Sequence, residues 1–457
     1  MTVAPPRPFP RVRPSVPAAG SSLVSAAEKR AVHIRAAVES VQRSLGTSDS
    51  VFAAWQDVLA SRWRHEPLAL SEAPALQVAW ALVSMRLVGR SVGALDVNAT
   101  LRDAEAWFLG SICPPSRLSE SVDEIASDEA IRALESFSYD DDLRDLLPYV
   151  LDAHGPGSRA SVMRDPGTQR SRRAKKAAGV FYTPSDVAEY ITREVFRALD
   201  TPDDAPRVLD PACGSGVFLK AAFDLSLASN SNLDPLEFVE RSLHGIDINP
   251  LAVEAACFVL LHQCLVAGKP GRTTSPWSMW HRIRCNLSVA DALAFQVVSG
   301  GSRRSEALEA LRASLDGNYV GPGAHRSSHD ESSAFFSRGQ TLGDVFPELA
   351  DGADAIIGNP PYATIGSRGD AEALERRYTT LLACGVSTSD YFPVFVEMMW
   401  RLGRAQRSSS GLVVPLSLAC STRAQMVAVR RAIMKSGGRW RFAFFDREPH
   451  ALFGEEV

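Results

Sequence analysis

The sequence predicts an α/β protein with a doubly wound parallel sheet, preceded by an all-helical N-terminal domain. After position 179, short apolar runs ending in glycine or proline turns alternate with stretches of helical apolar spacing. This rhythm is typical of parallel strands joined by helices. Between 22 and 155, apolar residues instead recur at helical spacing with few β-branched runs, as in 23–45 and 51–63. The length of 457 residues favours two or three domains over one.

The expected organisation follows composition along the chain. It comprises a disordered lead-in rich in proline and arginine (1–21), a helical N-terminal domain (22–155), a basic linker (156–178) and a sheet-containing domain (179–457) with a flexible insertion (299–338). Late in the chain, strands are expected from Gly411 and from Arg441, with a helix at 426–435 between them. The linker cluster can contact phosphate, although a solvated linker is an equally good interpretation; it consists of Arg170, Arg172, Arg173, Lys175 and Lys176.

Composition describes an ordinary globular protein and excludes several classes. The formal net charge of −4 provides no overall field that would attract nucleic acid, so any DNA contact must come from local basic surface. The seven cysteines contain no C-x-x-C pair, which indicates neither a zinc site nor a disulfide framework; no metal is expected. No signal peptide and no membrane-spanning stretch are found, and a cytoplasmic location is expected.

Three strand ends form the first candidate half of a site. VLDPACGSGVFL, at 208–219, places a strand before a turn with Gly214 and Gly216, where the backbone can approach a ligand; structural tight turns use the same residues. Asp247 ends the next strand and can accept hydrogen bonds from both hydroxyls of a ribose, or can cap the helix beginning near Pro250. Asp291 reaches the same edge of the sheet and can accept an adenine amine, although alone it reads as a turn residue.

The second candidate half is DAIIGNPPY, at 354–362, where a strand delivers an amide, two prolines and an aromatic ring. The side-chain oxygen of Asn359 and the carbonyl of Pro360 can accept hydrogen bonds from a conjugated exocyclic amine and localise its lone pair for attack on a methyl group. Pro360 and Pro361 lack competing N–H donors, and Tyr362 offers a face to a base turned out of a duplex. An ordinary loop is the alternative for this segment.

These motifs and their order resemble the γ class of amino-methyltransferases, the TaqI-like and type IIG restriction-modification methylases. GVFYTP at 179–184 resembles the family's cofactor-carboxylate motif, and DPACGSG, GIDINP, ADAL and GNPPY follow in the family's order. The resemblance covers 179–457 and implies a Rossmann-like methyltransferase sheet that binds S-adenosylmethionine and methylates the N6 amine of adenine in double-stranded DNA. For the N-terminal helices the resemblance is limited to the fact that type IIG enzymes also have a helical block before these motifs.

The resemblance also implies the role of each site residue. Thr183 would hold the methionine carboxylate, Asp210 and Gly214 would line the methionine end, Asp247 would bind the ribose and Asp291 the adenine. The full implied cofactor set is Phe181, Tyr182, Thr183, Asp210, Ala212, Gly214, Gly216, Asp247, Ile248, Asp291, Ala292, Asn359 and Phe395. The implied catalytic set is Asn359, Pro360, Pro361, Tyr362 and Phe453, the last as a second aromatic wall of the base pocket, with Phe445 or a plain core phenylalanine as alternatives.

Two other functions remain open at this point: an amino-methyltransferase acting on protein glutamine or ribosomal RNA, and a non-catalytic DNA-binding subunit that kept the fold. GVFYTP and the long helical block argue against the first, and the intact Asn-Pro-Pro-Tyr argues against the second. In the γ class a sequence-reading domain follows the catalytic domain, and none is recognisable here. We therefore expect either a fragment or a modification subunit of a restriction-modification or phage-defence system whose recognition domain belongs to a separate subunit.

Overall fold

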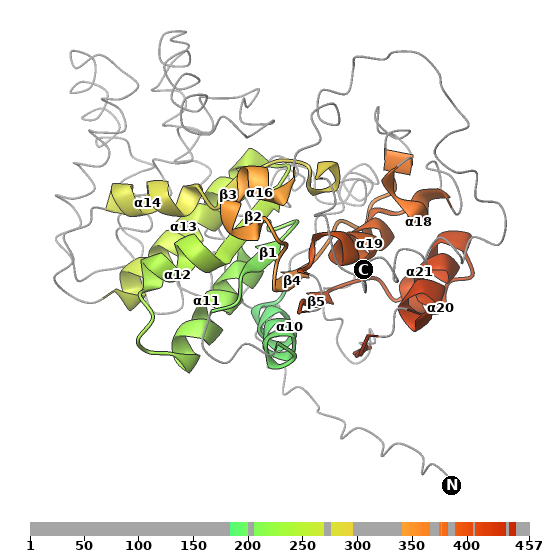
Figure 1. The fold of residues 1–457 in the computed structure, drawn as a ribbon, viewed down its shortest axis with the longest axis horizontal. Coiled ribbons are helices and arrows are strands. Elements are labelled where there is room, and N and C mark those ends of the chain that lie inside the picture. Colours follow the sequence, from blue (N-terminus) through green and yellow to red (C-terminus); the bar gives the residue numbers. More distant parts are fainter. Residues whose placement is uncertain are drawn as a thin grey trace, which may run out of the picture.

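The structure, a computed structural model, describes residues 183–199, 205–268, 276–295, 341–365, 374–375, 377–382, 389–404, 407–435 and 438–444 (Figure 1). Several sequence-based predictions lie outside these residues: the lead-in, the N-terminal helical domain, the basic linker, the insertion at 299–338, and Phe181, Tyr182, Phe445 and Phe453. The fold described below is therefore that of the predicted sheet-containing domain.

A five-stranded sheet forms the centre of the described chain, and every paired neighbour in it is parallel. Its strands are β1 (Val208–Asp210), β2 (Leu243–Asp247), β3 (Leu287–Val289), β4 (Ala355–Gly358) and β5 (Ser409–Leu412), in the spatial order β3-β2-β1-β4-β5. The chain proceeds outward from β1 to β3 and then returns to β4 on the other side of β1. The predicted doubly wound sheet is confirmed, and its switch point lies between β1 and β4.

Helices cover both faces of this sheet. One face is covered by α10 (Ser185–Arg197), which contacts β4 and β5, by α11 (Val217–Ser229), which contacts β1 and β2, and by α13 (Pro250–Ala267), which contacts β2 and β3. Beside them, α12 (Pro235–Ser242) and α14 (Pro276–Arg284) pack against α13, as Figure 1 shows.

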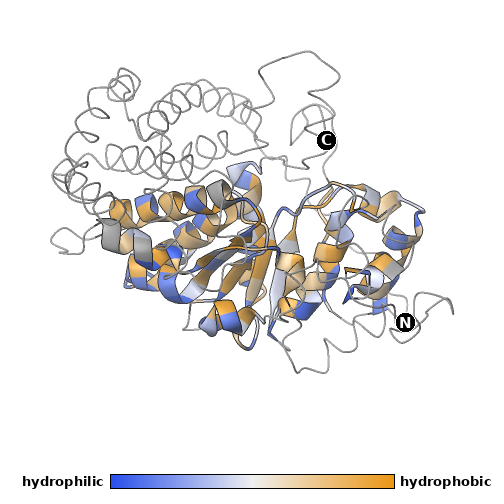
Figure 2. Cartoon of the chain, turned by 90° about the horizontal axis from the view of Figure 1, so that it is seen from above, coloured by the Kyte–Doolittle hydropathy of each residue, from blue (hydrophilic) through white to orange (hydrophobic). Residues whose placement is uncertain are grey.

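The other face packs on α19 (Tyr391–Leu402) and α21 (Ala424–Lys435). Leu209, Ile246 and Ile356, one from each of three central strands, are buried in one cluster with Phe392 and Met426. Figure 2 shows the strands coloured as hydrophobic between the helices. The remaining short elements are η1 (Ala292–Ala294), α16 (Leu342–Val345), η2 (Pro347–Leu349), α18 (Thr379–Leu382) and α20 (Ser417–Cys420).

The two late strands differ from prediction. β5 begins at Ser409, two residues before the predicted start at Gly411. It already ends at Leu412, so it is shorter than the predicted apolar run. The strand predicted from Arg441 is wrong for residues 441–444, which form no ladder. Trp440, Phe442 and Phe444 alternate as in a strand, and their rings stack at centroid distances of 6.4 and 6.2 Å. Alternation describes side-chain direction only, whereas a strand also needs a hydrogen-bonding neighbour, and the described residues provide none.

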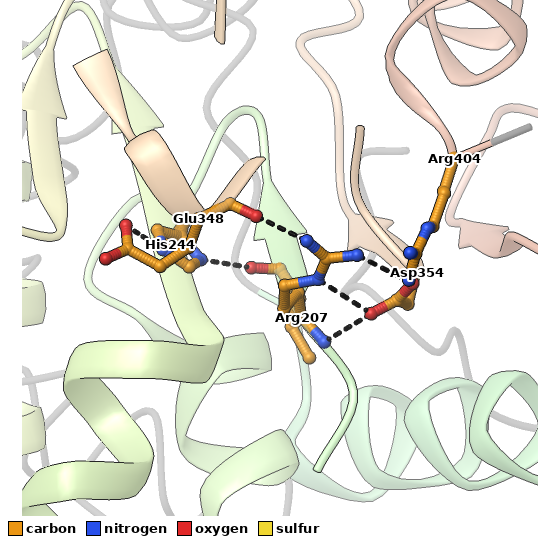
Figure 3. A network of polar contacts seen from close by, with 6 residues as sticks. Arg207, His244, Glu348, Asp354 and Arg404 are labelled. Atoms are coloured by element: carbon orange, nitrogen blue, oxygen red, sulfur yellow. Dashed lines mark hydrogen bonds and ion pairs between the residues drawn. The ribbon is translucent and has the colours of Figure 1, made fainter. Parts of the chain in front are cut away.

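A polar network fastens the amino ends of the central strands (Figure 3). The backbone N–H and the Nε of Arg207, directly before β1, each donate to Asp354 Oδ2 at 3.1 Å, directly before β4. Arg404 donates to Asp354 Oδ1 at 3.2 Å, and Arg207 also donates to the carbonyl of Glu348 at 2.6 Å. Burial raises the pKa of Asp354, but hydrogen bonds from Arg207 outweigh it and leave the pKa below its ordinary value. This network holds β1 and β4 together at the edge of the sheet opposite the candidate site.

Candidate active site

The carboxyl ends of four strands bring the predicted polar residues to one edge of the sheet. Asp210 and Asp247 are the last residues of β1 and β2, and Asn359 directly follows β4. Asp291 lies two residues beyond β3. Since these strands are parallel, the four side chains share the edge where open α/β sheets bind ligands.

The turn after β1 is built around two glycines with positive φ. Gly214 has φ of 52° and Gly216, which precedes α11, has φ of 86°. A Cβ atom on Gly216 would come within 3.1 Å of Ala256, so this glycine allows close packing of α11 on α13. A Cβ atom on Gly214 would have no heavy atom within 4 Å, so the turn is open on that side and leaves room for a ligand against the backbone.

Asp247 joins this turn to the end of β2. Its Oδ2 accepts a hydrogen bond from Gly214 N at 3.0 Å and its Oδ1 accepts one from Asn249 N at 2.8 Å. Burial raises the pKa of Asp247, and the backbone hydrogen bonds oppose that rise. A carboxylate has about four acceptor positions, so it can still receive a ribose hydroxyl beside the backbone N–H groups of Gly214, Ile248 and Asn249. Ile248 beside it is 62% exposed and offers an apolar surface at the same edge.

Asp210 is the most buried acid of the site and has one unused oxygen. Its Oδ1 accepts a hydrogen bond from Ala212 N at 3.1 Å, while Oδ2 is buried with no partner among the described residues. Burial raises the pKa of Asp210 well above its ordinary value, with the charge of Asp247 adding to the rise. A Cβ atom on Gly358 would lie 2.7 Å from Asp210 Oδ1, so a larger residue there would displace the Asp210 side chain. An unpaired buried carboxylate oxygen suits a cationic ligand, as the methionine end of S-adenosylmethionine requires.

Asp291 is held in a loop that the segment after β4 fastens down. Its Oδ1 accepts a hydrogen bond from Leu293 N at 3.0 Å and caps η1, which includes the buried Ala292. Tyr378 Oη donates to the carbonyl of Leu293 at 3.0 Å, and Arg377 donates to the carbonyls of Leu293 and Ala294. Sequence reasoning did not single out Arg377 or Tyr378, because nothing in their local pattern shows that they reach a distant loop.

Asn359 is held between two side chains in the substrate half. Its Nδ2 donates to Thr183 Oγ1 at 3.0 Å, and its Oδ1 accepts from Tyr362 Oη at 2.5 Å. Pro360 is buried and Pro361 partly buried. The Tyr362 ring meets Phe392 edge-on at a centroid distance of 6.4 Å. Burial raises the pKa of Tyr362, which keeps its hydroxyl protonated as a donor.

The aromatic residue beside this half is therefore Phe392, which sequence reasoning missed. Phe395, which the resemblance places in the cofactor set, is one turn further along α19 and is 5% exposed in the main core cluster, which also contains Ala292. Phe392 and Phe395 are three positions apart on a helix and therefore lie on the same side of it. Their spacing could have identified both as candidate aromatic residues of the site.

Among the described residues, no group of three or more His, Cys, Asp or Glu side chains is arranged to hold a metal ion. The helices that the structure describes include none that combines the length and the apolar character needed to cross a membrane.

The structure thus brings an open glycine turn on one central strand next to Asn-Pro-Pro-Tyr on its neighbour, the arrangement that the sequence predicts for an S-adenosylmethionine-dependent amino-methyltransferase. Two family models match the chain within that class. The model described as "Eco57I restriction-modification methylase" matches residues 241–437, and the one described as "N-6 DNA Methylase" matches residues 168–266. The predicted resemblance to N6-adenine DNA methyltransferases of the restriction-modification type is confirmed, and with it S-adenosylmethionine as the methyl donor.

Two curated relatives are similar to parts of the chain. The adenine-specific methyltransferase PglX of Streptomyces coelicolor is 27% identical over 205 residues, which cover 43% of this chain and 15% of PglX. The type II methyltransferase M.MamI of Microbacterium ammoniaphilum is 36% identical over 87 residues, 18% of this chain and 24% of M.MamI. The chain thus matches a quarter or less of either relative's length. Among solved structures, the DrdV–DNA complex aligns with a TM-score of 0.45 and 14% identity, covering 88% of this chain and 36% of that one.

Proposed function

We propose that this chain transfers a methyl group from S-adenosylmethionine to the N6 amine of an adenine turned out of double-stranded DNA, as the modification component of a restriction-modification or phage-defence system. The observation that carries this proposal is the placement of Asn359: it directly follows β4 at the switch point, beside the strand that ends in Asp210. Its amide is held by Thr183 and Tyr362.

The proposed reaction needs only hydrogen-bond acceptors from the protein. S-adenosylmethionine supplies an electrophilic methyl group on a sulfonium. The amide oxygen of Asn359 and the carbonyl of Pro360 accept the two N–H groups of the adenine amine, which localises the nitrogen lone pair for attack. In the proposed step the new N–C bond would form as the sulfonium–methyl bond breaks, which would leave S-adenosylhomocysteine as a neutral thioether. The methylated amine would carry the positive charge and would lose one proton to solvent. The Tyr362 ring provides a face on which the extruded base stacks.

Four residues would hold the cofactor. Asp247 would accept the ribose hydroxyls, and Asp210 would face the cationic methionine end beside the open turn at Gly214. Asp291 would accept the adenine amine. The unpaired Oδ2 of Asp210 and the space at Gly214 support this arrangement.

The assay for this function maps methylated adenines in DNA from cells that express the chain with its genomic neighbours. We expect N6-methyladenine at a defined sequence. Asn359→Ala should reduce methyl transfer by at least a hundredfold and leave cofactor binding nearly intact, because its amide acts on the target amine. Asn232→Ala, in the exposed turn between α11 and α12, is the matched control and should methylate like the wild type.

Three results would count against the proposal. If Asn359→Ala keeps more than about a tenth of the wild-type rate, the amide does not have the proposed role. If methyl groups appear on protein glutamine or ribosomal RNA instead of DNA, the alternative amino-methyltransferase is correct. If no substrate is methylated while cofactor still binds, the non-catalytic subunit is correct.

A further inference from the structure

We propose that Thr183 is a positioning residue for the reaction: its hydroxyl fixes which end of the Asn359 side-chain amide faces the target base. This inference rests on the proposed function. It assigns Thr183 a task besides the contact to the methionine carboxylate that the sequence resemblance implies.

An amide has two chemically opposite ends, and only one of them suits the reaction. The oxygen can accept an N–H from an adenine amine, whereas the –NH₂ group would present donors to a group that is itself a donor. Asn359 therefore works in one of two orientations that differ by a rotation of 180° about its last side-chain bond. Something must select between them before the base arrives.

Thr183 and Tyr362 hold opposite ends of that amide. Asn359 Nδ2 lies 3.0 Å from Thr183 Oγ1, and Asn359 Oδ1 lies 2.5 Å from Tyr362 Oη. A threonine hydroxyl can donate as well as accept. Here Thr183 accepts from the amide nitrogen while Tyr362 donates to the amide oxygen, and the two contacts together direct the oxygen toward the side on which Tyr362 stands. The hydroxyl of Tyr362 occupies the oxygen as a donor, the same kind of group as the adenine N–H that would take its place.

The rigidity of Thr183 makes this selection effective. Its side chain is 6% exposed, and Pro184 follows as the cap residue of α10, accepting hydrogen bonds from Val187 N and Ala188 N. Helix α10 packs on β4 and β5, so Thr183 is fixed against the same strand that delivers Asn359, although 176 positions separate the two residues.

The test compares Thr183→Val, which keeps the shape but removes the hydroxyl, with Thr183→Ser, which keeps the hydroxyl. For Thr183→Val we expect kcat at saturating S-adenosylmethionine to fall at least tenfold, in addition to any loss of cofactor affinity from the missing carboxylate contact. Thr183→Ser should restore most of the rate. If Thr183→Val instead weakens cofactor binding and leaves kcat at saturation unchanged, Thr183 serves only the cofactor and the inference is overturned.

Two further measurements separate this inference from the proposed function. In an Asn359→Ala background, Thr183→Val should lower the residual rate no further, because the residue it positions is gone. The side-chain amide of Asn359, assigned by its loss in Asn359→Ala, should give a nitrogen–proton NMR signal that shifts in Thr183→Val and returns in Thr183→Ser. If no preparation methylates DNA, the proposed function fails while this signal still decides the contact; an unchanged signal in Thr183→Val overturns it.

Discussion

Asp210 and Asp354 stand at opposite ends of the two central strands, and their environments move their pKa values in opposite directions. Burial without a cationic partner raises the pKa of Asp210 well above the ordinary range, while hydrogen bonds from Arg207 leave that of Asp354 below it. Asp210 thus opposes folding when it is charged, and Asp354 favours folding when it is charged. A group that costs stability at the candidate site is a mark of function.

The prediction at this scale concerns stability against pH. Asp210 binds its proton more tightly in the folded chain, so its stabilising contribution is present below the ordinary carboxyl pKa and lost as pH rises through the raised value. Asp210→Asn should therefore raise the melting temperature relative to wild type at pH 8, by about 2 °C or more, and less at pH 5.

Asp354→Asn is the control, because its melting temperature at pH 8 should change in the opposite direction to that of Asp210→Asn. The contribution of Asp354 is present above the ordinary carboxyl pKa and lost as pH falls through the lowered value, so the variant should melt below wild type at pH 8. Thermal unfolding of both variants at the two pH values measures this. A lower melting temperature for Asp210→Asn at pH 8 would mean that the charged carboxylate has a partner in the free protein.

A second residue-scale prediction concerns Asp247. Hydrogen bonds from ribose hydroxyls to a charged acceptor contribute about 1.5–3 kcal/mol each, so Asp247→Ala should weaken S-adenosylmethionine binding at least tenfold by calorimetry. Asp234→Ala is the matched control, because Asp234 also accepts two backbone N–H groups, at the start of α12. It should bind the cofactor normally. An unchanged affinity in a folded Asp247→Ala protein would remove Asp247 from the site.

At the scale of elements, an experiment can distinguish a ligand-binding turn after β1 from a turn that is only structural. Gly214 and Gly352 both have positive φ, at 52° and 94°. An added Cβ atom on Gly352 would lie 2.8 Å from backbone atoms of 402–404, whereas one on Gly214 would have no heavy atom within 4 Å. Gly214→Ala should therefore cost only the left-handed backbone strain, about 1–2 kcal/mol, yet abolish cofactor binding. Gly352→Ala should lower the melting temperature more.

Cofactor titration and thermal unfolding of these two glycine variants provide the measurement. Normal S-adenosylmethionine affinity in Gly214→Ala would show that the open space beside this turn is not where the cofactor lies.

The elements that sequence predicted well are those whose signal is local. A strand, a glycine turn and a helix follow one another at 208–229, and both Asp247 and Asn359 stand where apolar runs end. The elements that it missed depend on distant partners. The segment at 441–444 alternates like a strand but pairs with nothing in the described part of the chain, and the contact of Phe392 with Tyr362 requires knowing how α19 lies across the sheet.

The candidate site divides in the same way. Each strand end could be placed at a common edge once the sheet was predicted to be parallel. The hydrogen bond from Asn359 to Thr183 could not be predicted from the sequence. The resemblance already implied a different role for each residue, and a side-chain hydrogen bond across 176 positions leaves no pattern in the sequence.

For the whole molecule, we predict that cofactor binding and sequence recognition are separable. The described domain carries the candidate cofactor and base sites, and the net charge of −4 gives little general affinity for phosphate. The purified chain should bind S-adenosylmethionine and methylate duplex DNA weakly, without a defined site. Adding the product of an adjacent gene should restore sequence-specific N6-adenine methylation. Efficient, site-specific methylation by residues 1–457 alone would show that this chain reads the sequence itself.

The network between Arg207 and Asp354 has a consequence for how the protein is made. It joins residues 147 positions apart, whereas β1, β2 and β3 all lie within 208–289. During synthesis, at roughly 5–20 residues per second, β1, β2 and β3, together with Asp291 just after β3, leave the ribosome several seconds before Asn359 is synthesised. The pairing of β1 with β4 can therefore form only after the long segment between them has been synthesised. The residues that would bind the methyl donor are therefore synthesised before the Asn-Pro-Pro-Tyr segment that would bind the target base.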